Sequence, residues 1–179
     1  KNGMSAHRYF ANRHEEVIWL AKSDDYYFDL DSVREPYAEK DLAAALKDKR
    51  LNPENTMKGK NPTNVWEINR LNGNSKERVG HPTQKPVEII TRFVRALSYP
   101  GSVVLDFFAG SGTTGRVCIA EGRHCLMCDR DQTSVDYFSK HLSLMRELGQ
   151  CTSYMPVDTV ERFFVELEGE NAYERDTAI

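Results

Sequence analysis

The feature that most constrains the fold is the stretch Val103-Val104-Leu105-Asp106-Phe107-Phe108-Ala109-Gly110-Ser111-Gly112-Thr113-Thr114. A short apolar run rich in branched residues ends at Asp106, and a turn containing two glycines follows it directly. Glycine has no Cβ, so the backbone can bend sharply there and come close to a ligand. This order predicts a buried strand that feeds a tight turn and then a helix.

The segments on either side extend this pattern. Apolar residues recur at helical spacing after Pro86, and glycines stand where two further helices are expected to end. The expected elements are a helix from 86 to 97, strands at 102–105 and 124–128, and helices at 113–121 and 132–148. Strands that alternate with helices across short loops predict a βαβ unit on a parallel sheet.

The glycine turn has the chemistry of a nucleotide-type site. A helix N-terminus offers free N–H groups and a positive dipole end to a carboxylate or phosphate. Asp129 follows the second strand, 23 residues after Asp106, where an acid binds ribose hydroxyls in such folds. Gly110–Gly115 also satisfies G-x-G-x-x-G. A nicotinamide enzyme, or a tight turn without any ligand, therefore stays open on local spacing alone.

The hexapeptide His81-Pro82-Thr83-Gln84-Lys85-Pro86 precedes the helix that leads to the glycine strand. Two prolines stiffen it around polar donors, and its position lets it reach back over the turn. This second motif favours S-adenosylmethionine over a dinucleotide as the ligand.

Together, His81–Pro86 and Asp106–Thr114 resemble the cofactor motifs of the β-class amino DNA methyltransferases, which modify N6 of adenine or N4 of cytosine. The resemblance implies an α/β, Rossmann-like S-adenosylmethionine-dependent methyltransferase fold, incomplete, with an inserted target-recognition segment. The implied cofactor-binding residues are His81, Thr83, Lys85, Asp106, Phe107, Phe108, Gly110, Ser111, Gly112, Thr113 and Asp129. Lys85 is the implied partner of the methionine carboxylate, and Asp129 that of the ribose.

The resemblance covers roughly residues 1–145. Over this range the chain resembles a restriction–modification adenine-N6 methyltransferase acting at GAATTC. It implies four parts. Residues 1–30 end the catalytic half with β-hairpin strands, 31–80 form the target-recognition segment, 81–148 form the cofactor-binding βαβ lobe, and 149–179 form an acidic tail.

The family's catalytic motif is an Asp/Asn/Ser-Pro-Pro-aromatic tetrapeptide that holds the amine of a flipped base. No Pro-Pro dipeptide occurs among the seven prolines. The resemblance therefore assigns no catalytic residue to this chain and implies that the motif lies before residue 1. On this basis the chain alone is expected to be inactive. The alternatives are a cofactor- and DNA-binding subunit or remnant that needs a partner, and an NAD-dependent oxidoreductase.

The net charge of −3 hides a split along the chain. Residues 47–95 hold eleven basic and five acidic residues, whereas residues 147–179 hold eight acidic and two basic ones. Arginine, lysine and asparagine can contact phosphates and base edges, so the basic segment predicts binding to double-stranded DNA. The expected DNA-binding residues are Lys49, Arg50, Lys58, Lys60, Asn64, Arg70, Asn72, Asn74 and Arg78. Trp66 is expected to anchor this segment to the core.

Composition adds exclusions. No apolar run approaches the ~20 residues of a membrane span, and the N-terminus has no signal-peptide core, so no membrane partner and a cytoplasmic location are expected. Cys125 and Cys128 point to opposite sides of a strand and are expected to be structural, so no metal is expected. A homodimer or a complementing catalytic half stays open as the protein partner.

Overall fold

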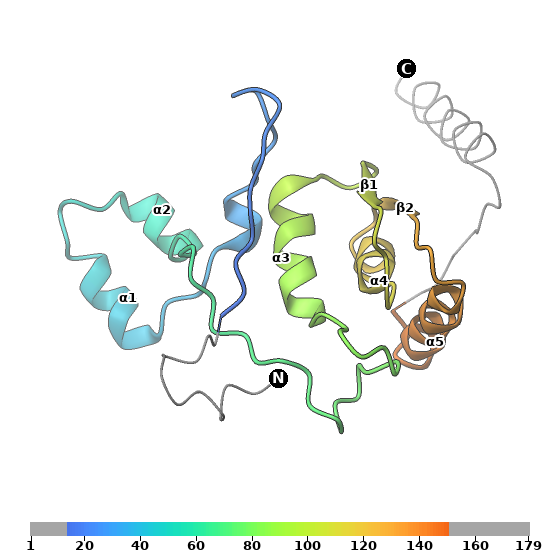
Figure 1. The fold of residues 1–179 in the computed structure, drawn as a ribbon. Coiled ribbons are helices and arrows are strands. Elements are labelled where there is room, and N and C mark those ends of the chain that lie inside the picture. The colour runs from blue at the N-terminus through green and yellow to red at the C-terminus, as the bar shows by residue number, and fades with distance from the viewer. Residues whose placement is uncertain (1–13, 151–179) are drawn as a thin grey trace, which may run out of the picture.

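A computed structural model describes residues 14–150 of the chain. Residues 87–147 form a compact lobe that contains three helices and a short sheet (Figure 1). The helices are α3 (Val87–Leu97), α4 (Thr113–Ala120) and α5 (Thr133–Glu147), and the strands are β1 (Val103–Asp106) and β2 (His124–Met127). The predicted helices and strands of this lobe are confirmed.

The sheet has the parallel pairing expected of a βαβ unit. β1 and β2 run parallel with Val104 opposite Cys125. Val104 and Cys125 pack against a core formed by Val94 of α3 and Val117 and Cys118 of α4. The interior of this lobe therefore lies between the helices and one face of the sheet.

The other face of β1 is open. Val103 and Leu105 alternate with the core-facing residues along the strand, and both are exposed. Parallel sheets are normally covered on both faces, and two strands alone make a marginal sheet. Within residues 14–150 nothing pairs with the free edge of β1. The apolar residues on this face have no cover in the part of the chain that the structure describes.

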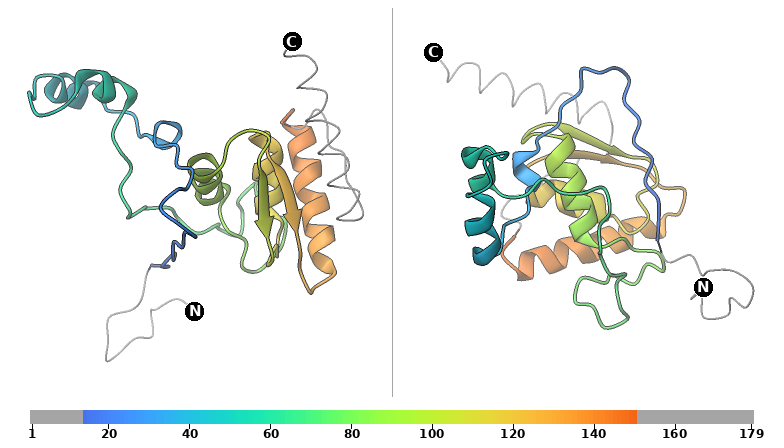
Figure 2. Two further views of the ribbon diagram at one scale, coloured as in Figure 1. Left: turned by 90° about the horizontal axis from the view of Figure 1, so that it is seen from above. Right: turned by 90° about the vertical axis from the view of Figure 1, so that its left-hand side faces the viewer.

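The predicted β hairpin within residues 1–30 is wrong where it can be seen, because no strand forms over residues 14–28. The chain does reverse there, since the ring of Trp19 packs on those of Tyr26 and Phe28 with both centroid distances 5.5 Å. Figures 1 and 2 show the tip of this segment projecting from the rest of the fold, whereas at its end the ring of Tyr27 packs edge-on against that of Tyr99. Its apolar side chains are exposed, so the sequence pattern of a strand is present without a sheet to join.

Residues 31–60 form a small helical lobe beside α3. It contains the 3-10 turn η2 (Asp31–Val33), α1 (Glu39–Ala45) and α2 (Pro53–Lys58). An antiparallel bridge between Glu35 and Lys60 closes the lobe. The half-buried Arg34 strengthens this closure by donating to the carbonyl oxygen of Gly59 at 3.0 Å.

Helix α2 lies within residues 31–80, the predicted target-recognition segment. Asn52 caps it by accepting from the N–H of Asn55 at 3.1 Å, and Pro53 occupies its first turn. Both are ordinary helix-start signals. The sequence shows no apolar stripe that would indicate this helix, because a six-residue helix at the surface buries few side chains.

Residues 61–86 return along the surface to α3 with almost no regular structure (Figure 2). Trp66 anchors this segment, as predicted. Its ring lies 5.1 Å from that of Phe93, under the guanidinium of Arg92, and its indole N–H donates to the carbonyl oxygen of Thr63. No helix among the described residues is long and apolar enough to cross a membrane.

Candidate cofactor site

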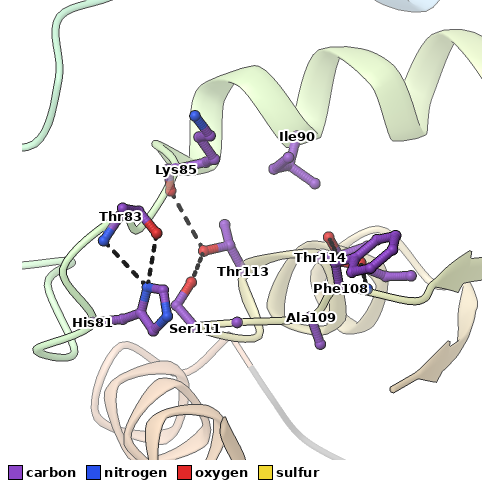
Figure 3. Close-up of a pocket in the computed structure, with 11 residues that line it drawn as sticks. His81, Thr83, Lys85, Ile90, Phe108, Ala109, Ser111, Thr113 and Thr114 are labelled. Carbon is purple, nitrogen blue, oxygen red and sulfur yellow. Dashed lines mark hydrogen bonds between the residues drawn. The ribbon is translucent and has the colours of Figure 1, made fainter. Parts of the chain in front are cut away.

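A cavity of about 210 Å³ lies where the two sequence motifs meet, at the carboxyl end of β1 (Figure 3). The loop before α3 forms one wall, and the turn between β1 and α4 forms the other. The lining residues are His81, Thr83, Lys85, Ile90, Asp106, Phe108, Ala109, Gly110, Ser111, Thr113 and Thr114. Pockets that enclose a drug-sized ligand measure roughly 300–1,000 Å³, so these walls enclose part of such a molecule.

Asp106 organises the turn at the end of β1. One of its carboxylate oxygens accepts from the backbone N–H of Phe108 at 3.0 Å, and the other from the hydroxyl of Thr114 at 2.6 Å. Both ends of the turn are thereby tied to one side chain. The Phe108 ring is 90% exposed beside this turn, so it offers a bare aromatic face at the rim of the cavity.

The two glycines of the turn have different reasons to be glycine. Gly110 has φ +50°, and a Cβ there would lie 3.3 Å from the His81 ring, across the cavity wall. Gly112 has φ +78°, and a Cβ there would lie 2.9 Å from Phe138 of α5. Gly110 therefore keeps the floor of the cavity free, whereas Gly112 allows α4 and α5 to pack closely.

The backbone N–H groups of the turn are largely used within the fold. Those of Phe108, Ala109, Gly110 and Gly112 donate to Asp106, Cys128, Asp129 and Ala109, respectively. These four donors precede the first turn of α4, which begins at Thr113, so the expectation that free N–H groups at the start of this helix receive an anion stays a prediction.

Asp129 lies behind the turn rather than along the cavity wall. Its carboxylate accepts from the N–H of Asp131 at 2.9 Å and of Gly110 at 2.7 Å. These backbone donors, that of Asp131 most, hold the pKa of Asp129 below its ordinary value. The carboxylate is exposed and ionised, and its first task in this structure is to position Gly110.

The loop 81–86 supplies the opposite wall. The backbone N–H of Thr83 donates to Nδ1 of His81 at 3.3 Å, which ties the His81 ring to the loop, and this ring packs edge-on against Tyr137 of α5. The hydroxyl of Thr113 bridges to Ser111 and to the carbonyl oxygen of Lys85 (Figure 3). The two motifs are thus in direct contact.

The ammonium group of Lys85 forms an ion pair with the carboxylate of Glu15, 70 residues earlier in the chain. Both side chains are substantially exposed. The lysine implied to hold a ligand carboxylate therefore holds a carboxylate in this structure, supplied by the protein itself.

Eight of the eleven predicted cofactor residues line the cavity, and three do not: Phe107, Gly112 and Asp129. Their roles toward a ligand stay predictions. Ile90, Ala109 and Thr114 line it and were not predicted. Thr114 lies inside the glycine motif, so the sequence could have indicated its place in the cavity wall. Ile90 lines the cavity only because α3 folds back over the turn.

The predicted DNA-binding residues are spread over the small lobe and the return segment. Lys58 is paired with Asp31 at 2.5 Å and Arg50 with Asp48 at 2.7 Å. Lys60 lies over the ring of Tyr37, and Arg78 donates weakly to the carbonyl oxygen of His81. Several cations of this segment are therefore held in place by the protein, which the sequence alone did not indicate.

Comparison with known proteins identifies similar sequences that include both motifs. The DNA methylase family N6_N4_Mtase matches residues 1–140. Type II methyltransferase M.BglII of Bacillus subtilis is 34% identical over 142 residues, which is 79% of this chain and 39% of that protein. Type II methyltransferase M.ScaI of Streptomyces caespitosus is 37% identical over 129 residues, 68% of this chain and 40% of that protein.

The chain belongs to the N6/N4 DNA methylase family. DNA adenine methyltransferase YhdJ of Escherichia coli strain K12 is a further relative, 38% identical over 124 residues, 68% of this chain and 42% of that protein. The chain therefore spans about two fifths of the length of the curated relatives it matches. The family predicted from the two motifs is confirmed, and its matched region ends near the middle of α5.

Among solved structures, the fold is similar to the M1.HpyAVI–SAM complex, with 27% identity, a TM-score of 0.38, and coverage of 45% of this chain and 41% of that one. It is also similar to the PvuII cytosine-N4-specific DNA methyltransferase, with 21% identity, a TM-score of 0.41, and coverage of 60% and 36%. The fold class of this N6/N4 DNA methylase rests on its family and on its own parallel β1–α4–β2 unit.

Proposed function

We propose that this chain is the cofactor-binding and target-recognition part of a DNA methyltransferase that transfers a methyl group from S-adenosylmethionine to N6 of adenine in duplex DNA. The observation that carries the proposal is the cavity between the two motifs, in a chain of the DNA methylase family. Bound S-adenosylmethionine would supply an electrophilic methyl group on its sulfonium.

The residues present fit this cofactor. The small residues of the turn leave room that a Cβ at Gly110 would reduce, and the His81 ring bounds that room. Lys85 presents an ammonium that already takes a carboxylate, so it would receive the methionine carboxylate in exchange for Glu15. The bare Phe108 ring would cover an apolar face of the ligand. Asp129 as the partner of the ribose stays a prediction, because its carboxylate accepts from Gly110 and does not line the cavity.

The segment 31–80 is proposed to bind DNA. Its surplus of basic residues suits the phosphate backbone. The lobe holding α1 and α2 is fixed to α3 by the N–H of Asp29, which donates to Ala96 at 2.8 Å, and by Arg92, which pairs with Glu35. A recognition segment anchored to the cofactor lobe would hold the DNA at a constant position relative to the methyl donor.

Adenine-N6 as the target atom is supported by the likeness to a relative named a DNA adenine methyltransferase. The GAATTC site stays a prediction. The oxidoreductase alternative has no support from the family match. The restriction–modification role is supported by relatives named type II methyltransferases.

The catalytic tetrapeptide is proposed to belong to another part of the same enzyme. Three observations fit a sheet that continues beyond these residues. One face of β1 is open, residues 14–28 form no strand, and the cavity encloses only part of a ligand. The same observations favour the second candidate, a cofactor- and DNA-binding subunit completed by a partner. In both cases the chain alone would bind S-adenosylmethionine and DNA but would not catalyse methyl transfer efficiently.

The test uses the complete enzyme, duplex DNA and S-adenosylmethionine labelled in the methyl group. After digestion of the DNA to nucleosides, the label is expected in N6-methyladenine. Label in N4-methylcytosine would contradict the adenine assignment. Absence of transfer by the complete enzyme, with transfer only after a second protein is added, would favour the partner-dependent candidate.

A further inference from the structure

We infer that Gln84 is a positioning residue that holds the loop 81–85 against the glycine turn and so sets the shape of the cofactor cavity. Gln84 belongs to the hexapeptide but faces away from the cavity, and it is 8% exposed. The inference rests on the proposed function only for the identity of the ligand.

The side-chain amide of Gln84 joins the loop to the residues before it through two backbone contacts. Its carbonyl oxygen accepts from the N–H of Val79 at 2.9 Å, and its NH₂ group donates to the carbonyl oxygen of Glu77 at 2.7 Å. A buried backbone group without a partner is costly, and Val79 is only 4% exposed. The single amide therefore satisfies a buried donor and an acceptor two residues away from it.

These contacts matter for the cavity because Gln84 stands between its lining residues. His81 and Thr83 precede it, and Lys85 follows it, so the position of the amide determines where all three lie. The loop is also held from α5, where the ammonium of Lys140 donates to the carbonyl oxygen of Val79 at 3.3 Å. Gln84 thus links the cavity wall to Val79, whose carbonyl oxygen accepts a hydrogen bond from α5.

Glutamine is the residue that this place requires. A glutamate would keep the acceptor for Val79 but would set an oxygen against the Glu77 carbonyl. A methionine of similar length would leave both backbone groups without a partner. We therefore expect Gln84→Met to leave both backbone groups without a partner, whereas Gln84→Glu keeps the contact with Val79 and disturbs that with Glu77.

Thr56 provides a matched control. It is 5% exposed, and its hydroxyl donates to the carbonyl oxygen of Asn52 at 2.8 Å within α2, away from the cavity. The Thr56→Val substitution also removes a buried side-chain to backbone hydrogen bond. It should lower stability without moving the cavity wall.

The experiment measures two quantities on the complete enzyme, at a temperature where every variant is folded. The first is the Kd for S-adenosylmethionine by calorimetry, which should rise about tenfold or more in Gln84→Met, because small misplacements of binding groups are costly, and stay unchanged in Thr56→Val. The second is hydrogen exchange of peptides spanning residues 77–86, read by mass spectrometry. The Val79 amide should exchange faster in Gln84→Met and keep most of its protection in Gln84→Glu.

Two results would overturn the inference: faster exchange at Val79 with an unchanged Kd, or an equal rise of the Kd in Thr56→Val. If the wild-type enzyme binds no S-adenosylmethionine, the proposed function fails. The exchange measurement then decides by itself whether Gln84 holds the loop, since unchanged exchange in Gln84→Met would refute that claim.

Discussion

Lowering the pH should destabilise this fold through one buried histidine. His141 of α5 is completely buried, and neither ring nitrogen has a hydrogen-bond partner among the described residues. Burial, and then the nearby guanidinium of Arg116, lower the pKa of His141 from 6.5 to about 4. The folded state therefore resists a proton that the unfolded chain accepts.

The sign and the size follow from this difference. Because the folded-state pKa lies below the unfolded value, the unfolded chain binds more protons in between, and stability is lost as the pH falls from about 6.5 toward 4. A single group with these two pKa values costs about 2 kcal/mol at pH 5 and about 3 kcal/mol at pH 4. Above pH 7.5 the contribution is close to zero.

The assay is urea unfolding of the wild-type enzyme and the His141→Leu variant between pH 4 and 8. Leucine does not titrate, so the difference between the two proteins cancels the contributions of the other ionisable groups. The variant should gain stability relative to wild type as the pH falls, by about 2 kcal/mol between pH 7.5 and pH 5. A difference that does not change with pH would refute the reasoning.

Three further outcomes are expected. Lys85→Ala should weaken S-adenosylmethionine binding about 10- to 100-fold, since it removes a charged hydrogen-bond partner, whereas Glu15→Gln should tighten binding by freeing that ammonium; equal affinities in calorimetry would contradict both. Gly112→Ala should destabilise the enzyme by about 2–4 kcal/mol, because the Cβ would meet Phe138 at a positive φ, and an unchanged urea midpoint would count against this packing. Lys60→Ala should reduce the salt dependence of DNA binding by about one unit of slope, and Lys58→Ala should reduce it less, because Asp31 already holds that ammonium; an unchanged slope in the double variant would exclude this surface.

The cofactor lobe could be predicted from the sequence because its signals are local. The strand, turn and helix around residues 103–120 each have their own pattern, and short parallel connections leave few topologies. The hairpin at residues 14–28 failed for the opposite reason. Its apolar residues have the composition of strands, but strands form only where other strands pair with them.

Within the site, the motif residues were predicted and their partners were not. That Lys85 pairs with Glu15, and that Asp129 accepts from Gly110, depends on how distant segments meet. Gln84 belongs to a recognisable motif, but its role could not be predicted, since only the fold reveals that Val79 and Glu77 face its amide. Residues that support a site without lining it follow no recognisable spacing in a single sequence.

The most direct test of the central claim is a crystal structure of the complete enzyme with S-adenosylhomocysteine, the product of methyl transfer. The ligand is expected between the loop 81–85 and the turn 108–114, with its carboxylate on the ammonium of Lys85 and Glu15 displaced. A ligand bound elsewhere, with the Lys85–Glu15 pair intact and this cavity empty at saturating concentration, would contradict the account.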